Sequence, residues 1–222
     1  MRGFDAMLYE FVLLVKHSPV RGRALKHWTL WALATAFGWS LAAYAGLPIG
    51  RVVLAEGGPE AIFSVGVTMG VLGMLIGGMI GASQWMYLRW RMRDANWWIP
   101  ATSLGWGIGL PFALWINLLA GLGLSAFLYG VVIGGAVGLG QWVLLKRSTS
   151  PAGKWILISV VALPIGIALT GLIDQRLILW SGIESEQARW FTAFSGGVAG
   201  LVVGLLTGMT LLVLLARRRG NT

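Results

Sequence analysis

Residues 77–89 read Gly-Gly-Met-Ile-Gly-Ala-Ser-Gln-Trp-Met-Tyr-Leu-Arg, and residues 134–146 read Gly-Gly-Ala-Val-Gly-Leu-Gly-Gln-Trp-Val-Leu-Leu-Lys. The two stretches lie 57 residues apart, and at the same offset Trp98-Ile99 matches Trp155-Ile156 without a gap. The segment 31–39 repeats the pattern of 98–106 in the same way, with Trp at both of its ends. The chain therefore contains an internal repeat, and its unit is long enough for two helices.

The composition places these repeats in a membrane. Of the 222 residues 57% are hydrophobic and 11% are charged, whereas about a quarter of the residues of a soluble domain are charged. A helix that crosses a bilayer needs about 20 apolar residues. We predict an all-α membrane protein with six transmembrane helices, at about residues 28–47, 61–88, 97–119, 122–145, 155–173 and 189–215.

The repeat groups these spans into three two-helix hairpins, at about 28–88, 97–145 and 155–215, within one domain of residues 28–216. Each unit has an even number of spans, so the copies should run parallel about an axis along the membrane normal. The sixth span is a weaker copy. We align its Gly204, Thr207, Thr210 and Leu214 with the Gly, Gly, Gln and Leu of the earlier copies.

The even-numbered spans carry glycine at every fourth position. This spacing places the glycines on one helix face, and small residues there let membrane helices approach closely. We expect the even helices to pack against one another and the odd helices to lie outside them. The residues predicted to make these contacts are Gly70, Gly77, Gly81, Gly130, Gly134, Gly138, Gly200, Gly204 and Gly208.

The positive charges predict the orientation. Alternate connections carry 14 of the 17 Lys and Arg residues, and such residues gather on the cytoplasmic side. We expect both termini in the cytoplasm, within a bacterial inner (plasma) membrane. Residues 4–15 have helical apolar spacing but are too short to span, so residues 1–27 should form an interfacial amphipathic helix and a basic connector. Residues 217–222 should form a basic cytoplasmic tail.

Few polar side chains lie within the spans, and these are the candidate site residues. Gln84 and Gln141 stand one turn from the cytoplasmic ends of their helices, and Asn117 lies in the third span. A buried amide must find hydrogen-bond partners. These three residues should therefore contact either a ligand or a neighbouring helix.

Tryptophans gather near the predicted cytoplasmic interface. We interpret Trp85, Trp98, Trp142 and Trp155 as interface anchors of the aromatic belt. The alternative interpretation is a bound lipid or pigment. The chain has no cysteine and only two histidines. It contains no nucleophile elbow, Walker loop, zincin helix or dinucleotide-binding fingerprint. We therefore predict no catalytic residues, no metal and no cofactor.

The repeated element Gly-Gly-x-x-Gly-x-x-Gln-Trp-x-x-Leu-Arg/Lys at 77–89 and 134–146 resembles that of uncharacterised bacterial multi-pass membrane proteins built from such hairpins. The resemblance covers about residues 28–215 and implies the same helical architecture. The group carries no assigned activity, so the resemblance adds no function.

Two functions remain open from the sequence. The first is a non-enzymatic accessory or packing subunit, whose partners are membrane lipids and either a membrane protein or a second copy. The alternative is a small-molecule transport component that binds a substrate in the membrane. The net charge of +9 does not indicate nucleic acid, because the orientation of the spans explains it.

Overall fold

The structure is a computed structural model that describes residues 21–56, 62–120, 126–147, 152–181 and 185–220. The predicted interfacial helix at 4–15 lies outside these residues. The described chain is helical, with one short 3-10 turn, η2 (Ala95–Trp97), before α4. The long helices are α2 (Arg21–Glu56), α3 (Ile62–Leu88), α4 (Trp98–Ala120), α5 (Ala126–Leu145), α6 (Lys154–Ser181) and α7 (Ser185–Gly220).

Five stretches of the described helices are long and apolar enough to cross a membrane: Ser64–Leu88, Ala95–Ile116, Phe127–Leu145, Lys154–Arg176 and Gln187–Leu215. The described part of α2 does not meet this condition. Its apolar run contains Trp28, Trp31 and Trp39, whose rings are amphipathic and favour the membrane interface. These tryptophans, which have low hydropathy values, contribute to the lower mean hydropathy of this helix.

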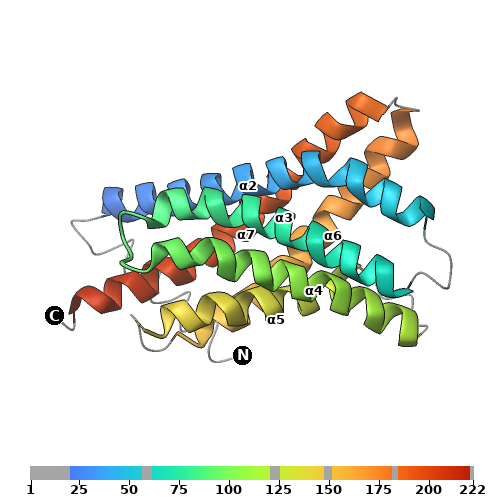
Figure 1. The fold of residues 1–222 in the computed structure, drawn as a ribbon. Helices are drawn as coiled ribbons and strands as arrows, with labels where there is room; N and C mark the ends of the chain where they lie inside the picture. Colours follow the sequence, from blue (N-terminus) through green and yellow to red (C-terminus); the bar gives the residue numbers. More distant parts are fainter. Residues whose placement is uncertain (1–20, 57–61, 121–125, 148–151, 182–184, 221–222) are drawn as a thin grey trace.

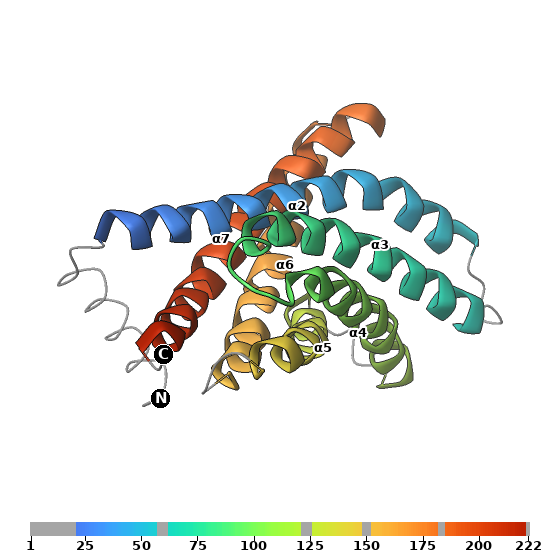
Figure 2. The same cartoon turned by 60° about the vertical axis from the view of Figure 1, so that its left-hand side comes forward.

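The six helices form a closed ring (Figures 1 and 2). Each helix packs against the next one along the chain, and α7 closes the ring by packing along α2. Three of these neighbouring pairs are in the most extensive contact: α3 with α4, α5 with α6, and α7 with α2. At one end of the bundle α6 and α7 incline away from α3, α4 and α5 in both views.

Glycines set the close contact within each of these pairs. A methyl group added at Gly77 of α3 would lie 2.6 Å from the carbonyl oxygen of Thr102 on α4. At Gly134 of α5 it would lie 2.5 Å from the carbonyl oxygen of Ser159 on α6. At Gly200 of α7 it would lie 2.9 Å from the Cα of Ala36 on α2. These separations leave no room for a side chain, so backbone packs on backbone.

The predicted glycine faces therefore lie on helix contacts, but their partners differ from the prediction. The even-numbered spans are α3, α5 and α7, and the odd-numbered spans are α2, α4 and α6. Each glycine face of an even helix lies against the odd helix with which it pairs, and not against another even helix. The expectation that the even helices pack together is wrong. The spacing of glycines identifies the face of a helix that approaches a neighbour, and it carries no information about which neighbour that is.

Outside these contacts the bundle presents apolar side chains to its surroundings. Leu33 and Phe37 on α2, Leu75 on α3, Ile108 on α4 and Leu157 on α6 are each at least half exposed. A soluble protein seldom exposes such continuous apolar surface. Lipid chains would cover it, in keeping with helices that can cross a membrane.

Adjacent glycines offer a matched test of the backbone contacts. Gly77→Ala and Gly134→Ala place a methyl group against a neighbouring backbone, and overpacking of this kind costs about 1–3 kcal/mol. Gly78→Ala and Gly135→Ala are the controls, because a methyl group there meets its nearest neighbour at 3.8 Å and 4.0 Å.

Thermal unfolding in mild detergent measures the difference. We expect lower midpoints for the first two variants and a wild-type midpoint for the controls. Equal midpoints for Gly77→Ala and Gly78→Ala would contradict the proposed close approach of α3 to α4.

Candidate functional site

Three tryptophans meet on the axis of the ring. Trp31 of α2, Trp98 of α4 and Trp155 of α6 are each at most 1% exposed. Their ring centroids are 6.0 Å, 6.2 Å and 5.7 Å apart, and every pair is edge-to-face, an arrangement that aromatic pairs favour. We name these residues the tryptophan triangle. Because they seal the centre of the bundle, the prediction of Trp98 and Trp155 as interface anchors is wrong.

Each indole of the triangle donates a hydrogen bond to the even helix with which its own helix pairs. Trp98 Nε1 donates to Gln84 Oε1 at 2.9 Å, and Trp155 Nε1 donates to Gln141 Oε1 at 2.8 Å. Trp31 Nε1 donates to Thr207 Oγ1 at 3.0 Å. A buried indole N–H needs such a partner, because hydrocarbon offers no acceptor.

The glutamines also reach the odd helix on their other side. Gln84 Nε2 donates to Thr35 Oγ1 of α2 at 3.3 Å, and Gln141 Nε2 donates to Thr102 Oγ1 of α4 at 2.9 Å. Each threonine hydroxyl in turn donates to the carbonyl oxygen of the residue four positions earlier, Trp31 or Trp98. Each glutamine therefore joins two odd helices through one even helix. Both glutamines have interhelical partners, as one of the two sequence interpretations expects.

The residue of α7 that corresponds to the glutamines, Thr207, does not join a second odd helix. Thr207 accepts from Trp31 but donates its proton to the carbonyl oxygen of Val203 at 2.8 Å. Ser159 of α6, in the place of Thr35 and Thr102, donates to the carbonyl oxygen of Trp155 at 2.9 Å. No amide therefore joins α7 to Ser159, and we name the boundary between α6 and α7 the seam.

These bonds correct the alignment of the sixth span. Thr207, and not Thr210, occupies the position of Gln84 and Gln141, because it accepts the corresponding indole proton. Gly204 packs on Ala32 and Thr35 as Gly81 packs on Ile99 and Thr102. An alignment of the four-residue glycine spacing, Gly196, Gly200 and Gly204 with Gly73, Gly77 and Gly81, would have found this register.

The structure adds site residues that the sequence interpretation missed. These are Trp31, Thr35, Thr102, Ser159 and Thr207. Their signal was present as Trp followed four residues later by Thr or Ser, at 31–35, 98–102 and 155–159. Asn117 lies on α4, but its side chain is outside the described part of the chain.

A small cavity lies between the glutamines and threonines. Its volume is about 20 Å³, and residues from all six helices line it, including Gln84, Gln141, Thr102, Ser159 and Thr207. A cavity needs about 10–15 Å³ to hold a water molecule. The space therefore suits a single water and excludes an organic ligand.

A second aromatic layer separates this space from a larger cavity. Trp39 of α2 and Trp106 of α4 meet edge-to-face with centroids 5.8 Å apart. Beyond them, toward the end where α6 and α7 incline away, lies an open cavity of about 250 Å³. We name this the distal end and the distal cavity. The residues that line the cavity are Trp39, Ala42, Ala43, Gly46, Ile76, Ile80, Trp106, Ile167, Thr170, Thr192 and Gly196.

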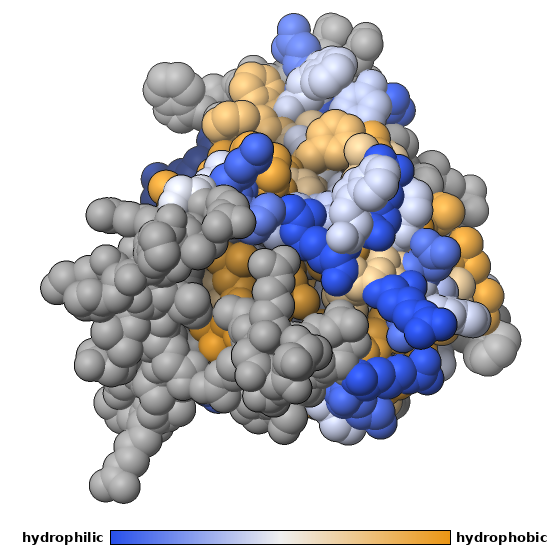
Figure 3. All heavy atoms as spheres, turned by 90° about the vertical axis from the view of Figure 1, so that its left-hand side faces the viewer, coloured by the Kyte–Doolittle hydropathy of each residue, from blue (hydrophilic) through white to orange (hydrophobic). Residues whose placement is uncertain are grey.

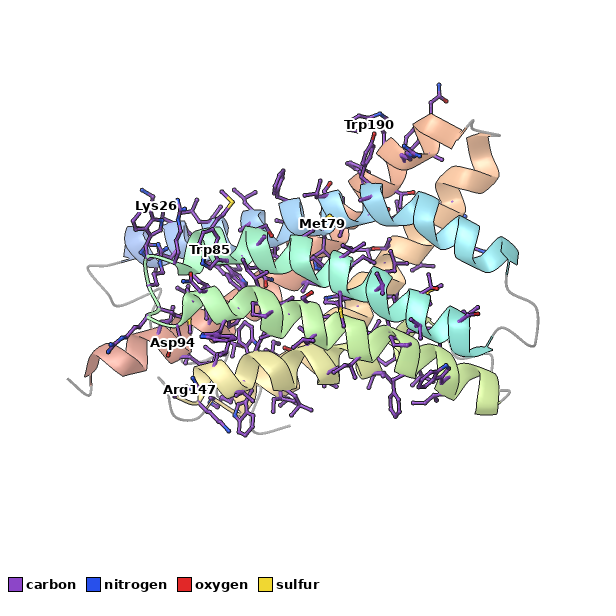
Figure 4. All side chains as sticks on the ribbon, in the orientation of Figure 1. Lys26, Met79, Trp85, Asp94, Arg147 and Trp190 are labelled. Atoms are coloured by element: carbon purple, nitrogen blue, oxygen red, sulfur yellow. The ribbon has the colours of Figure 1, made fainter. Side chains whose placement is uncertain are left out.

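Polar contacts at the distal end connect α7 to its two neighbours. Ser195 Oγ donates to Asp174 Oδ1 of α6 at 2.5 Å, and Ser40 Oγ of α2 donates to the carbonyl oxygen of Ala193 at 2.6 Å. Trp190 packs on Tyr44 with ring centroids 5.0 Å apart. Figure 4 places Trp190 at this end, opposite Lys26, Asp94 and Arg147.

The opposite end is basic. Hydrophilic side chains gather there (Figure 3), and the described cations are Lys26, Arg89, Arg91, Arg93, Lys146, Arg147 and Lys154. Arg89 lies over the Trp85 ring at 5.3 Å, and Lys146 lies over the Trp142 ring at 4.4 Å. Trp85 and Trp142 are partly exposed, and their role as interface anchors stays a prediction. We name this region the basic end.

The described residues contain no cluster of three His, Asp or Glu side chains that could hold a metal ion. Comparison of the chain with protein-family models, with curated proteins and with solved structures finds no match.

The missing link at the seam gives a testable prediction. In Thr207→Gln the new carbonyl oxygen can accept from Trp31, and the new amide N–H can donate to Ser159 across the central cavity. One added buried hydrogen bond is worth about 1 kcal/mol, so thermal unfolding in detergent should shift to higher temperature.

Trp155→Phe is the opposite change, because it leaves Gln141 Oε1 without its donor. We expect a loss of about 1–3 kcal/mol. A Thr207→Gln midpoint below that of wild type would show that the added amide does not make this bond. The same conclusion would follow if Thr207→Gln gave an equal gain in a Ser159→Ala background, where the acceptor is absent.

Proposed function

We propose that this chain is a non-enzymatic integral membrane protein that binds a small apolar molecule in the distal cavity. The observation that carries the proposal is the cavity itself: about 250 Å³ of open space inside a helix bundle, lined almost entirely by apolar side chains. Sites for small molecules are commonly concave, largely apolar and located between helices of a bundle. This is the ligand-binding alternative from the sequence, and the cavity now favours it.

We infer that α2 also spans the membrane, which brings the number of spans to six. It packs along both α3 and α7, and its Trp31, Thr35 and Trp39 are buried at the same levels as Trp98, Thr102 and Trp106 of α4. A helix that shares these layers must share the depth of its neighbours in the bilayer. The basic end would face the cytoplasm of a bacterial inner membrane by the positive-inside rule, which puts both termini there.

We further propose a threefold repeat, with a different pairing from the predicted hairpins. The repeated unit is an even helix with the odd helix on which its glycines pack. Two units are continuous in the chain, α3 with α4 and α5 with α6. The third joins α7 to α2. Its support is the set of corresponding contacts, in which Trp98 meets Gln84, Trp155 meets Gln141, and Trp31 meets Thr207.

The aromatic layers close the proposed binding site on the side that faces the basic end. The Trp39–Trp106 pair and the tryptophan triangle lie between the distal cavity and the basic end. Between them only about 20 Å³ is open. A ligand would enter and leave from the distal half, so the arrangement supports binding and not a continuous channel.

The accessory-subunit function stays a second proposal. Its support is the aromatic outer surface of α2 and α7, where Phe37, Trp190 and Phe194 are each more than 60% exposed. Such a ridge suits contact with a partner helix. Stoichiometric recovery of another membrane protein in mild detergent would favour this function over ligand binding.

The binding proposal is tested by filling the cavity. Gly46 lines it, and a methyl group there meets only the Ile76 side chain, at 3.6 Å, so Gly46→Phe should occupy the space without disturbing the backbone. Gly171→Phe is the control, because Gly171 is exposed and a methyl group there has no neighbour within 4 Å.

The probe is 1-adamantanol, a compact neutral cage, with saturable binding measured on protein in phosphatidylcholine nanodiscs. We expect binding to wild type and Gly171→Phe, and loss of at least about tenfold in affinity for Gly46→Phe, since the apolar contact area disappears. Absence of saturable binding to wild type, or equal binding to Gly46→Phe, would contradict the proposal.

A further inference from the structure

We propose that the natural ligand of the distal cavity is a cationic amphiphile, an apolar body with an ammonium group, and that Asp174 is its counter-ion. This inference rests on the proposed binding function and adds the charge and the orientation of the ligand. It follows from the position of the one described carboxylate near the cavity, its hydrogen bonding and the polar groups of the wall.

Asp174 continues the cavity-lining face of α6. Ile167 and Thr170 line the cavity, and residues at i, i+3 and i+7 share one helix face. Asp174 is therefore the next residue of that face, one turn nearer the distal end. Its partner Ser195 precedes the lining residue Gly196 on α7. The bond between them holds the carboxylate about one helical turn beyond the cavity lining, along the seam.

The carboxylate has no ion-pair partner within the described chain, although Arg176 and Arg189 stand near the same ends of α6 and α7. It is half-buried, its hydrogen-bond donor is the Ser195 hydroxyl, and none of the described Lys or Arg side chains forms an ion pair with it. A carboxylate at the end of a membrane span is costly unless it is paired or reaches water. A ligand ammonium group would supply the missing charge and up to three hydrogen-bond donors.

The hydroxyl groups that line the cavity also favour a ligand that donates hydrogen bonds. Thr170 donates its proton to the carbonyl oxygen of Gly166, and Thr192 donates to that of Ala188. Both hydroxyls can then offer only lone pairs to a ligand. Deeper in the cavity, Trp39 and Trp106 form an aromatic floor. The ligand would place its apolar body on this floor and its ammonium group toward Asp174.

A structural role for Asp174 is the competing explanation. The bond to Ser195 lies on the seam, where the glutamine link is missing, and could serve only to hold α6 against α7. This role needs a hydrogen-bond acceptor but not a negative charge. The charge of the ligand therefore separates the two explanations.

The experiment compares two cages of the same shape. Binding of 1-adamantylammonium and of 1-adamantanol is measured on full-length protein in phosphatidylcholine nanodiscs, which carry no net lipid charge. We expect wild type to prefer the ammonium cage by about tenfold, the worth of one hydrogen bond to a charged group. Asp174→Asn should lose this preference and bind both cages equally, with unchanged affinity for the alcohol.

Two further variants keep the test decisive. Asp174→Glu retains the charge and should retain the preference, and Asp94→Asn removes a carboxylate at the basic end and should change nothing. Equal binding of the two cages by wild type overturns this inference and leaves the proposed function standing. The same follows if Asp94→Asn, and not Asp174→Asn, abolishes the preference. Failure of wild type to bind either cage overturns the proposed function, and the inference with it.

Discussion

Helix backbones in this bundle approach so closely at glycine that a single methyl group would not fit at Gly77, Gly134 or Gly200. Lipid provides no hydrophobic force to hold helices together, so short-range packing and hydrogen bonds must do so. Because each even helix rests on one odd helix at this distance, the indole rings of Trp98 and Trp155 come within reach of Gln84 and Gln141. The polar network therefore depends on the glycine contacts.

The helices and the glycine faces could be predicted from the sequence, because length, apolar runs and four-residue spacing are local signals. The partners of those faces could not, since spacing does not distinguish one neighbouring helix from another. The same limit explains Trp98 and Trp155. A tryptophan near a helix end reads as an interface residue whether it points outward or, as here, into the ring axis. The two cavities depend on side chains from five or six helices, and no local pattern describes them.

The ring of helices is not uniform, and its irregular features lie at one boundary, between α6 and α7. The glutamine link is absent between α6 and α7, where Thr207 and Ser159 each donate to their own helix. At the same boundary the aromatic layer of Trp39 and Trp106 has Leu163 as its third member. α6 and α7 also incline away from α3, α4 and α5 (Figure 1), and the distal cavity lies beside them. At the seam the glutamine link is thus replaced by the Ser195–Asp174 bond nearer the distal end, beside the space in which we place the ligand.

One of the three helix pairs is assembled from the two ends of the chain, α7 with α2, whereas the others are consecutive. A much shorter chain of two helices could build a similar ring as a homotrimer. In such an assembly any substitution would appear three times, so a single carboxylate would become three like charges about the axis. A single chain that carries all three proposed units is free of that restriction. The position 57 residues before Asp174 is Asn117, and one subunit-equivalent could acquire a charge while another kept an amide. Covalent continuity would thus let the three proposed units of the ring diverge independently.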